Sequence, residues 1–222
     1  MTTLTLSEAA DLLDRSYKGR GSMPPLKLFK QHKYAQTFLT QDDILVIPGM
    51  NQNIDRLRGL DQWHVPGWMF RWGTYDQNIS KSTWLNLFIH YALDVRKLLG
   101  DHQPKLILGH SLGSGMTQIL AQHYKVPAIC FAVPAVCDKR KLTFQTYENM
   151  LNVQIDGDWL PTLLHDRGVL RRFGRTETVP LPAGHTSRHK IGSYVAAMQA
   201  GHGNLPPRWP MSGSTAGTGG HG

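Results

Sequence analysis

The sequence predicts an α/β fold, in which a mostly parallel central sheet has helices on both of its faces. Two apolar runs, Asp43 to Ile47 and Leu106 to Leu108, have the unbroken hydrophobicity of strands that are buried on both sides. The second run is followed by a glycine-containing turn and then by a segment with helical apolar spacing. Strands and helices go on alternating along the chain, and a parallel sheet between two helical layers buries both kinds of element.

The chain is long enough for one domain with a sizeable core. Its 222 residues are 41% hydrophobic, and two domains within this length would be cramped. We expect a single domain over residues 1–200, with an N-terminal helix and hairpin extension in residues 1–40. Residues 201–222 are rich in Gly, Pro and Ser and have little to bury, so we expect a disordered tail there.

The N-terminal extension begins with a helix. Thr5 and Glu8 are spaced as a capping box, and an apolar side runs along Ser7 to Arg15. Leu26 to Phe29 and Tyr34 to Leu39 have the composition of short strands, and they predict a hairpin at the edge of the sheet.

After Ile47 the sequence predicts first a connecting segment and then the remaining helices and strands of the core. Apolar residues recur every three positions between Met50 and Trp63, which predicts a short amphipathic helix. We interpret this helix as a core-facing connector in preference to a mobile lid. The Trp-, Gly- and Pro-rich residues 63–73 predict an irregular loop. Beyond it, the expected helices cover residues 82–99, 116–124 and 190–200, and the expected strands cover residues 106–108, 127–133, 151–155 and 176–181.

Residues 109–113 form the pattern G-x-S-x-G between an expected strand and an expected helix. In that context the pattern marks a nucleophile elbow, a tight turn that exposes a reactive serine. Glycines flank Ser111 because larger side chains there would collide with the strand and the helix. The alternatives are a chance match and a phosphate-binding loop, but no Lys-Ser or Lys-Thr pair follows the last glycine. Ser111 is therefore our candidate nucleophile.

A nucleophilic serine needs a base that takes its proton and an acid that orients the base. Behind a nucleophile elbow, the acid comes next in the chain and the histidine last. Asp156 and Asp158 directly follow an expected strand, and His185 and His189 lie in a loop before the last helix. Active groups gather at the carboxyl ends of parallel strands, so these residues and Ser111 are expected at one rim. Spacing alone leaves open which acid and which histidine act, whether the histidines are ordinary surface residues, and whether they form a metal-binding pair.

The chain resembles the class 3 (fungal-type) lipase family of α/β-hydrolases over residues 43–198. Five stretches carry the resemblance, and they come in the family's order: ILVIPGMNQNID, WHVPGW, LILGHSLGSG, ICFAVPAVCD and VQIDGDWLP. They are similar to the family's oxyanion turn, its His-x-Gly-Phe segment, its nucleophile elbow, the strand that follows, and the Asp-x-Val-Pro segment that bears the triad acid. The resemblance implies an α/β-hydrolase fold.

The resemblance also implies roles for individual residues. It assigns the triad acid to Asp158 and the triad histidine to His189, which precedes a tyrosine by five positions as in many family members. It implies an oxyanion hole made by the backbone N–H groups of Met50 and Leu112. Met50 stands where the family has Thr or Ser, so a side-chain hydroxyl is missing there. Gly115 replaces a frequent alanine, and we expect this to loosen the helix packing only slightly.

Residues and resemblance together predict a serine hydrolase that cleaves carboxylic esters of lipid type, a lipase or esterase, with no cofactor and no metal. The residues alone support only an acyl-transfer hydrolase. Two alternatives stay open: a catalytically impaired member of this fold that serves as a binding or assembly protein, and an acyltransferase. The expected partner is a lipid or other ester substrate; acyl length, head group and oligomeric state are not readable from the sequence.

The chain is basic, with a formal net charge of +8. Arg167, Arg171, Arg172 and Arg175 form a basic cluster, which we interpret as a solvated face, with anionic lipid contact as the alternative. No nucleic-acid-binding module is recognisable, so no nucleic-acid partner is expected. The two cysteines exclude a disulfide scaffold, and Cys130 is expected as a buried free thiol. No signal peptide or membrane-spanning segment is seen, so the sequence predicts a cytoplasmic location, with non-classical export left open.

Overall fold

The computed structural model describes residues 2–31, 36–49, 81–138, 149–162, 170–201 and 205–210. Several features expected from the sequence lie outside these residues. They are the helix between Met50 and Trp63, the loop over residues 63–73, the backbone of Met50 and the side chain of Arg167.

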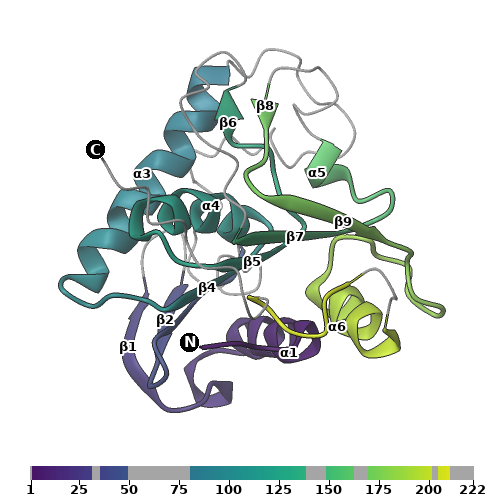
Figure 1. Ribbon diagram of the computed structural model, residues 1–222, viewed down its shortest axis with the longest axis horizontal. Coiled ribbons are helices and arrows are strands. Elements are labelled where there is room, and N and C mark those ends of the chain that lie inside the picture. Colours follow the sequence, from purple (N-terminus) through teal and green to yellow (C-terminus); the bar gives the residue numbers. More distant parts are fainter. Residues whose placement is uncertain are drawn as a thin grey trace, which may run out of the picture.

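A seven-stranded sheet forms the centre of the molecule (Figure 1). In their order across the sheet, the strands are β1 (Leu26–Gln31), β2 (Gln36–Thr40), β3 (Ile44–Ile47), β4 (Leu106–His110), β5 (Ala128–Phe131), β7 (Met150–Ile155) and β9 (Arg175–Val179). The strands from β3 to β9 run parallel, whereas β2 pairs antiparallel with both β1 and β3. The predicted mostly parallel sheet with a hairpin at its edge is confirmed.

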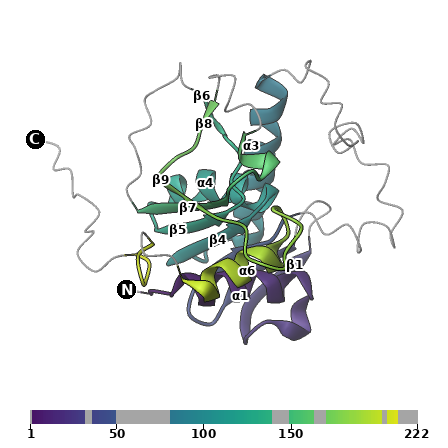
Figure 2. The ribbon, with the colours of Figure 1, turned by 90° about the vertical axis from the view of Figure 1, so that its right-hand side faces the viewer.

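Helices cover both faces of this sheet, as predicted. On one face lie α3 (Lys81–Leu99) and α4 (Leu112–Tyr124), and on the other lie α1 (Leu6–Tyr17) and α6 (Ile191–Ala200) (Figures 1 and 2). Neighbouring residues of one strand serve different layers: Ile107 joins the apolar cluster under α3 and α4, and Leu108 joins the cluster under α1 and α6. Both side chains are fully buried, which explains why this strand reads as an unbroken apolar run.

The N-terminal helix α1 belongs to the main core. Its capping box is confirmed, because the Glu8 N–H donates to the Thr5 hydroxyl at 3.1 Å and the Thr5 N–H donates to the Glu8 carboxylate at 2.7 Å. The buried side of the helix, with Leu13 at its centre, packs against β3, β4 and β5 and against α6. The last turn of α1 thereby brings Tyr17 to the carboxyl ends of β3 and β4.

The structure also contains short elements that no sequence pattern predicts. They are the 3₁₀ turn η1 (Arg20–Ser22), the single-turn helix α5 (Trp159–Thr162), and the antiparallel pair of β6 (Cys137–Asp138) and β8 (Leu170–Arg171). Elements of two to four residues are too short to show a period. Within the part of the chain that the structure describes, no helix is long and apolar enough to cross a bilayer.

The C-terminal segment differs from the sequence prediction. Leu4 and Trp209 exchange two backbone hydrogen bonds, of 3.0 and 2.8 Å. The Trp209 side chain is buried, and its indole N–H donates to the carbonyl of Asn149 at 3.1 Å. A disordered tail starting at Gly201 is therefore wrong for residues 205–210, because one large aromatic side chain supplies the apolar area that anchors them.

Candidate active site

Ser111 lies in the tight turn between β4 and α4. Its backbone has φ 58° and ψ −130°, a conformation that residues other than glycine rarely adopt. Such a conformation costs on the order of 1–3 kcal/mol and persists only where its surroundings enforce it. Here the Ser111 N–H donates to the Phe131 carbonyl at 3.0 Å, and the Ser111 carbonyl accepts from the Ser114 N–H at 3.0 Å. The turn therefore has the strained backbone that a nucleophile elbow requires.

Close packing explains the glycines around this turn. A Cβ at Gly113 would lie 2.1 Å from the carbonyl oxygen of Ile47, so a side chain there would push α4 away from β3. A Cβ at Gly115 would lie 2.2 Å from the ring of Phe88 on α3. The expectation that Gly115 only loosens its helix is wrong, because this glycine is what lets α3 and α4 approach each other.

His189 reaches Ser111 from the loop that precedes α6. Its Nε2 atom lies 2.8 Å from Oγ of Ser111. The His189 side chain is 24% exposed, so the ring is open to solvent while one edge contacts the serine. His189 is the histidine that the family resemblance selects, and the structure brings it to the strained turn.

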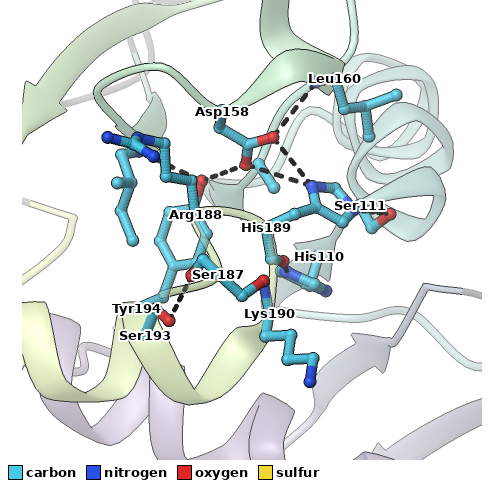
Figure 3. Close-up of polar contacts among 12 residues, drawn as sticks. His110, Ser111, Asp158, Leu160, Ser187, Arg188, His189, Lys190, Ser193 and Tyr194 are labelled. Carbon is cyan, nitrogen blue, oxygen red and sulfur yellow. Dashed lines mark hydrogen bonds and ion pairs between the residues drawn. The ribbon is translucent and has the colours of Figure 1, made fainter. Parts of the chain in front are cut away.

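Asp158 follows β7 and is buried. Its Oδ1 and Oδ2 atoms lie 3.0 and 3.1 Å from Nδ1 of His189. The backbone N–H of Leu160 donates to Oδ1 at 3.1 Å, and the Tyr194 hydroxyl donates to Oδ2 at 2.7 Å (Figure 3). These donors replace the water that a buried carboxylate gives up.

Tyr194 connects Asp158 to the sheet. Its hydroxyl accepts from the backbone N–H of Ile155 at 3.1 Å while it donates to the carboxylate. Burial first, and the charge of Asp158 second, raise the pKa of Tyr194 well above its usual value, so this donor keeps its proton at every pH used in ordinary assays.

These contacts determine where the protons lie. An ionised carboxylate only accepts hydrogen bonds, so Nδ1 of His189 carries a proton and donates it to Asp158. In the neutral ring, Nε2 then has a lone pair that accepts from the Ser111 hydroxyl. The serine proton therefore points at an atom able to remove it.

The other candidates from the sequence point elsewhere. Asp156 is exposed on the turn after β7, and its backbone carbonyl accepts from Nε of Arg188 at 3.0 Å. His185 has its Nδ1 atom 3.2 Å from Oγ of Ser193 on α6. Both contacts brace the loop that carries His189. Among the described residues, no group of three His, Cys, Asp or Glu side chains is arranged to hold a metal ion.

Leu112 supplies a backbone donor next to Ser111. It is the first residue of α4, and first-turn amides lack intrahelical acceptors and carry the positive end of the helix dipole. The Pro48–Gly49 segment after β3 borders the same place, because a Cβ at Gly49 would lie 2.7 Å from Cβ of Ser111. The second donor expected from the resemblance, the N–H of Met50, lies outside the described residues.

His110 is buried beneath the serine turn and joins several elements. Its Nδ1 atom lies 2.6 Å from the Tyr17 hydroxyl, and its Nε2 atom lies 3.0 Å from the backbone carbonyl of His189. Burial first, and the neighbouring His189 second, hold the pKa of His110 well below its usual value of 6.5. Tyr17 does not figure among the site residues predicted from the sequence, since no local pattern relates the end of α1 to residue 110.

Because His110 stays neutral in the fold, it is expected to reduce stability in acid. Below about pH 6.5 an unfolded chain protonates this histidine and the folded chain does not, so unfolding becomes more favourable as the pH falls. One such group changes the free energy of unfolding by at most about 1.4 kcal/mol per pH unit. Urea unfolding of the wild type and His110→Asn, from about pH 8 to about pH 5, should show a shallower pH dependence in the variant. Plots of the free energy of unfolding against pH that run parallel for the two proteins would contradict this prediction.

Comparisons with known proteins give a likeness of fold. No protein-family model matches the chain, and no curated protein sequence matches it. A solved mutant form of MDLA from Penicillium cyclopium is similar, with 12% identity and a TM-score of 0.48, over 82% of this chain and 79% of that one. A solved fungal lipase is similar too, with 10% identity and a TM-score of 0.47, over 85% of this chain and 81% of that one. At these values the likeness says nothing of activity; the α/β fold follows from the chain's own mostly parallel sheet and its two helical layers.

Proposed function

We propose that this protein is a serine hydrolase that cleaves carboxylic esters. The observation that supports the proposal most directly is the chain of hydrogen bonds from Ser111 through His189 to Asp158. In this proposal Ser111 is the nucleophile, His189 is the general base, and Asp158 orients the base.

The proposed reaction uses each contact in turn. Oγ of Ser111 attacks the ester carbonyl while Nε2 of His189 takes the serine proton. The tetrahedral intermediate then breaks its bond to the alcohol, which leaves with the proton from His189, and an acyl-serine remains. Water attacks this acyl group while His189 takes a proton from the water. The bond between the acyl carbon and Oγ of Ser111 then breaks, His189 returns the proton to Oγ, and the carboxylic acid is released. Asp158 stabilises the imidazolium that forms in both halves of the reaction.

The proposed oxyanion hole consists of backbone donors. The N–H groups of Leu112 and Met50 would stabilise the negative charge on the carbonyl oxygen, and each such donor typically lowers the barrier by about 3–4 kcal/mol. Backbone donors suit this chain, because methionine at position 50 has no hydroxyl to contribute.

A lipid-type ester is the proposed substrate class. Trp159 is 42% exposed, and its ring centroid lies 5.2 Å from that of His189. An open apolar surface thus borders the ring that would protonate the leaving alcohol. This placement favours a substrate with an apolar chain beside the reacting carbonyl.

We expect Trp159→Ala to raise KM for long-chain esters about tenfold and KM for an acetate ester less than about twofold. The reason is that a longer substrate chain covers more of the indole, so that removing the indole leaves more apolar surface of the bound ester in water. The matched control is Trp159→Phe, which keeps an aromatic surface and should remain close to the wild type. An equal rise in KM for all chain lengths would contradict a contact between Trp159 and the apolar chain of the substrate.

The basic cluster gives weaker support for a lipid surface as partner. Arg171 and Arg175 are exposed, but Arg175 pairs with Glu177 at 2.5 Å, and Arg172 donates to the Pro161 carbonyl. These contacts favour a solvated and partly paired face. Contact with anionic lipid therefore stays a prediction, which binding to vesicles with and without anionic lipid would test.

Hydrolysis and active-site labelling test the proposed function together. The wild type should hydrolyse p-nitrophenyl esters, and the chain length with the highest kcat/KM should separate an esterase from a lipase. A fluorophosphonate should modify the folded protein at Ser111, as located by mass spectrometry of its peptides, and should not modify heat-unfolded protein. Folded protein that shows neither turnover nor labelling would reject the proposal in favour of a binding role. Transfer of the acyl group to an added alcohol in preference to water would favour an acyltransferase.

A further inference from the structure

The Tyr17 hydroxyl contacts two parts of the candidate site that lie far apart in the sequence. It accepts from the backbone N–H of Gly49 at 2.7 Å, and it lies 2.6 Å from Nδ1 of His110. Tyr17 is at the end of α1, Gly49 follows β3, and His110 ends β4. One partly buried tyrosine hydroxyl therefore joins a helix on one face of the sheet to the ends of two adjacent strands.

The direction of these hydrogen bonds follows from the backbone carbonyl of His189, which accepts from Nε2 of His110. The carbonyl of His189 only accepts, so Nε2 of His110 carries the ring proton and donates it. The ring is neutral, so Nδ1 is an acceptor and the Tyr17 hydroxyl donates to it. Burial raises the pKa of Tyr17 well above its usual value, which keeps that hydroxyl proton in place. The bonds run from Gly49 through Tyr17 and His110 to the backbone of His189.

This chain of bonds borders Ser111. A Cβ at Gly49 would lie 2.6 Å from the Tyr17 hydroxyl oxygen and 2.7 Å from Cβ of Ser111, so the Pro48–Gly49 segment is held between these two side chains. The rings of His110 and His189 have their centroids 5.5 Å apart, so the same bonds also border the base. Both sides of the serine are thus connected through one hydroxyl of α1.

We propose that Tyr17 is a positioning residue, which holds the Pro48–Gly49 segment and the backbone of His189 in fixed places on either side of Ser111. The inference rests on the proposed serine hydrolysis for its effect on rate. Tyr17 does not act on the substrate itself, because its hydroxyl is engaged by Gly49 and His110 and gives its proton to His110. Its effect passes through Gly49 and His110, which fix the backbone on either side of the attacking oxygen of Ser111.

The test is Tyr17→Phe, which keeps the ring and removes only the hydroxyl. We expect kcat to fall about 10- to 100-fold with KM changed less than about twofold, because misplaced donors weaken binding of the transition state and not of the ester. An alkyl boronic acid, which forms a tetrahedral adduct on the serine, should bind more weakly by the same factor as kcat/KM falls. The matched control is Tyr124→Phe, at a partly buried tyrosine at the far end of α4, which should change neither value.

Amide hydrogen exchange supplies a readout that does not depend on activity. In Tyr17→Phe the Gly49 amide loses its acceptor, so the peptide containing Gly49 should exchange at least about tenfold faster, while peptides of α3 should not change. If this peptide exchanges faster but kcat and boronic acid binding stay normal, Tyr17 holds the segment without affecting the reaction, and the positioning role is overturned. If exchange of this peptide does not change, Tyr17 does not hold the segment, and the whole inference is overturned. If the wild type neither hydrolyses esters nor reacts with fluorophosphonate, the proposed function fails. The exchange result then decides whether Tyr17 holds this segment.

Discussion

The Ser111→Ala protein is expected to keep the wild-type fold and to lose ester hydrolysis, with kcat lower by about 10⁵- to 10⁶-fold. The substitution removes Oγ, the atom that lies 2.8 Å from Nε2 of His189 and would form the acyl-enzyme. The backbone at φ 58° is no harder for alanine than for serine, so the free energy of unfolding should change by less than about 1 kcal/mol. Initial rates with p-nitrophenyl esters, and urea midpoints for the same samples, measure both effects.

Ser22→Ala is the matched control, because Ser22 lies in the short 3₁₀ turn that follows α1 and is remote from the triad in the chain. It should retain full turnover. Pure, folded Ser111→Ala that still hydrolyses esters at a tenth of the wild-type rate or more would contradict the serine mechanism. Labelling by fluorophosphonate should disappear in the same variant, and persistent labelling would identify a different nucleophile.

Asp158→Asn should lower kcat by about 10⁴-fold while Ser111 and His189 remain present. The neutral amide no longer fixes the proton on Nδ1 or stabilises the imidazolium, so Nε2 is often protonated and unable to accept from the serine. Some stability should be lost as well, since an amide NH₂ group facing the Tyr194 hydroxyl would meet a donor. We expect about 1–3 kcal/mol less free energy of unfolding. Rates must therefore be compared well below the unfolding temperature of the variant.

Asp156→Asn provides the same chemical change two positions away, on an exposed side chain. It should leave kcat within about twofold of the wild type. Equal losses in the two variants would mean that charge near β7, and not the contact of Asp158 with His189, sustains the rate. A loss confined to Asp156→Asn would reverse the assignment of the acid.

The strands, the helices and the serine turn could be predicted because their signals are local. An unbroken apolar run identifies β4, a reciprocal pair of polar residues identifies the start of α1, and flanking glycines identify the turn at Ser111. Each of these depends on neighbours within a few positions. The same holds for the placement of candidate groups after parallel strands, which needs only the order of strands and helices.

The choice between neighbouring polar residues could not be made from spacing. Asp156 and Asp158 follow the same strand, and Gly157 between them has φ 72°, which turns one carboxylate toward solvent and the other into the core. Only the packing of α6 and of its preceding loop decides which carboxylate meets a histidine. Similarity to a family separated them, where the local pattern did not.

Tyr17 and Trp209 show what a linear pattern leaves out. Tyr17 contacts Gly49, which follows β3, and His110, which ends β4. Trp209 pairs with Leu4, more than 200 positions away in the sequence. In sequence, one is an aromatic residue at a helix end and the other lies in a stretch rich in glycine and proline. Their partners are fixed by tertiary structure, so neither residue is marked by its neighbours.

The backbone pairing of Leu4 with Trp209 has a consequence for how the protein is made. The apolar side of α1 is synthesised first, but its partners in β5 and α6, and finally Trp209, come later in the chain. At ordinary rates of translation, α1 waits on the order of 10–40 s before its last partner exists. The domain therefore closes only after almost all of it has left the ribosome, and its folding is governed by contacts between distant residues, which form slowly. In nascent chains the part of α1 that faces α6 has no partner until α6 has been synthesised, which makes recovery of folded protein sensitive to the chaperones of the expression host.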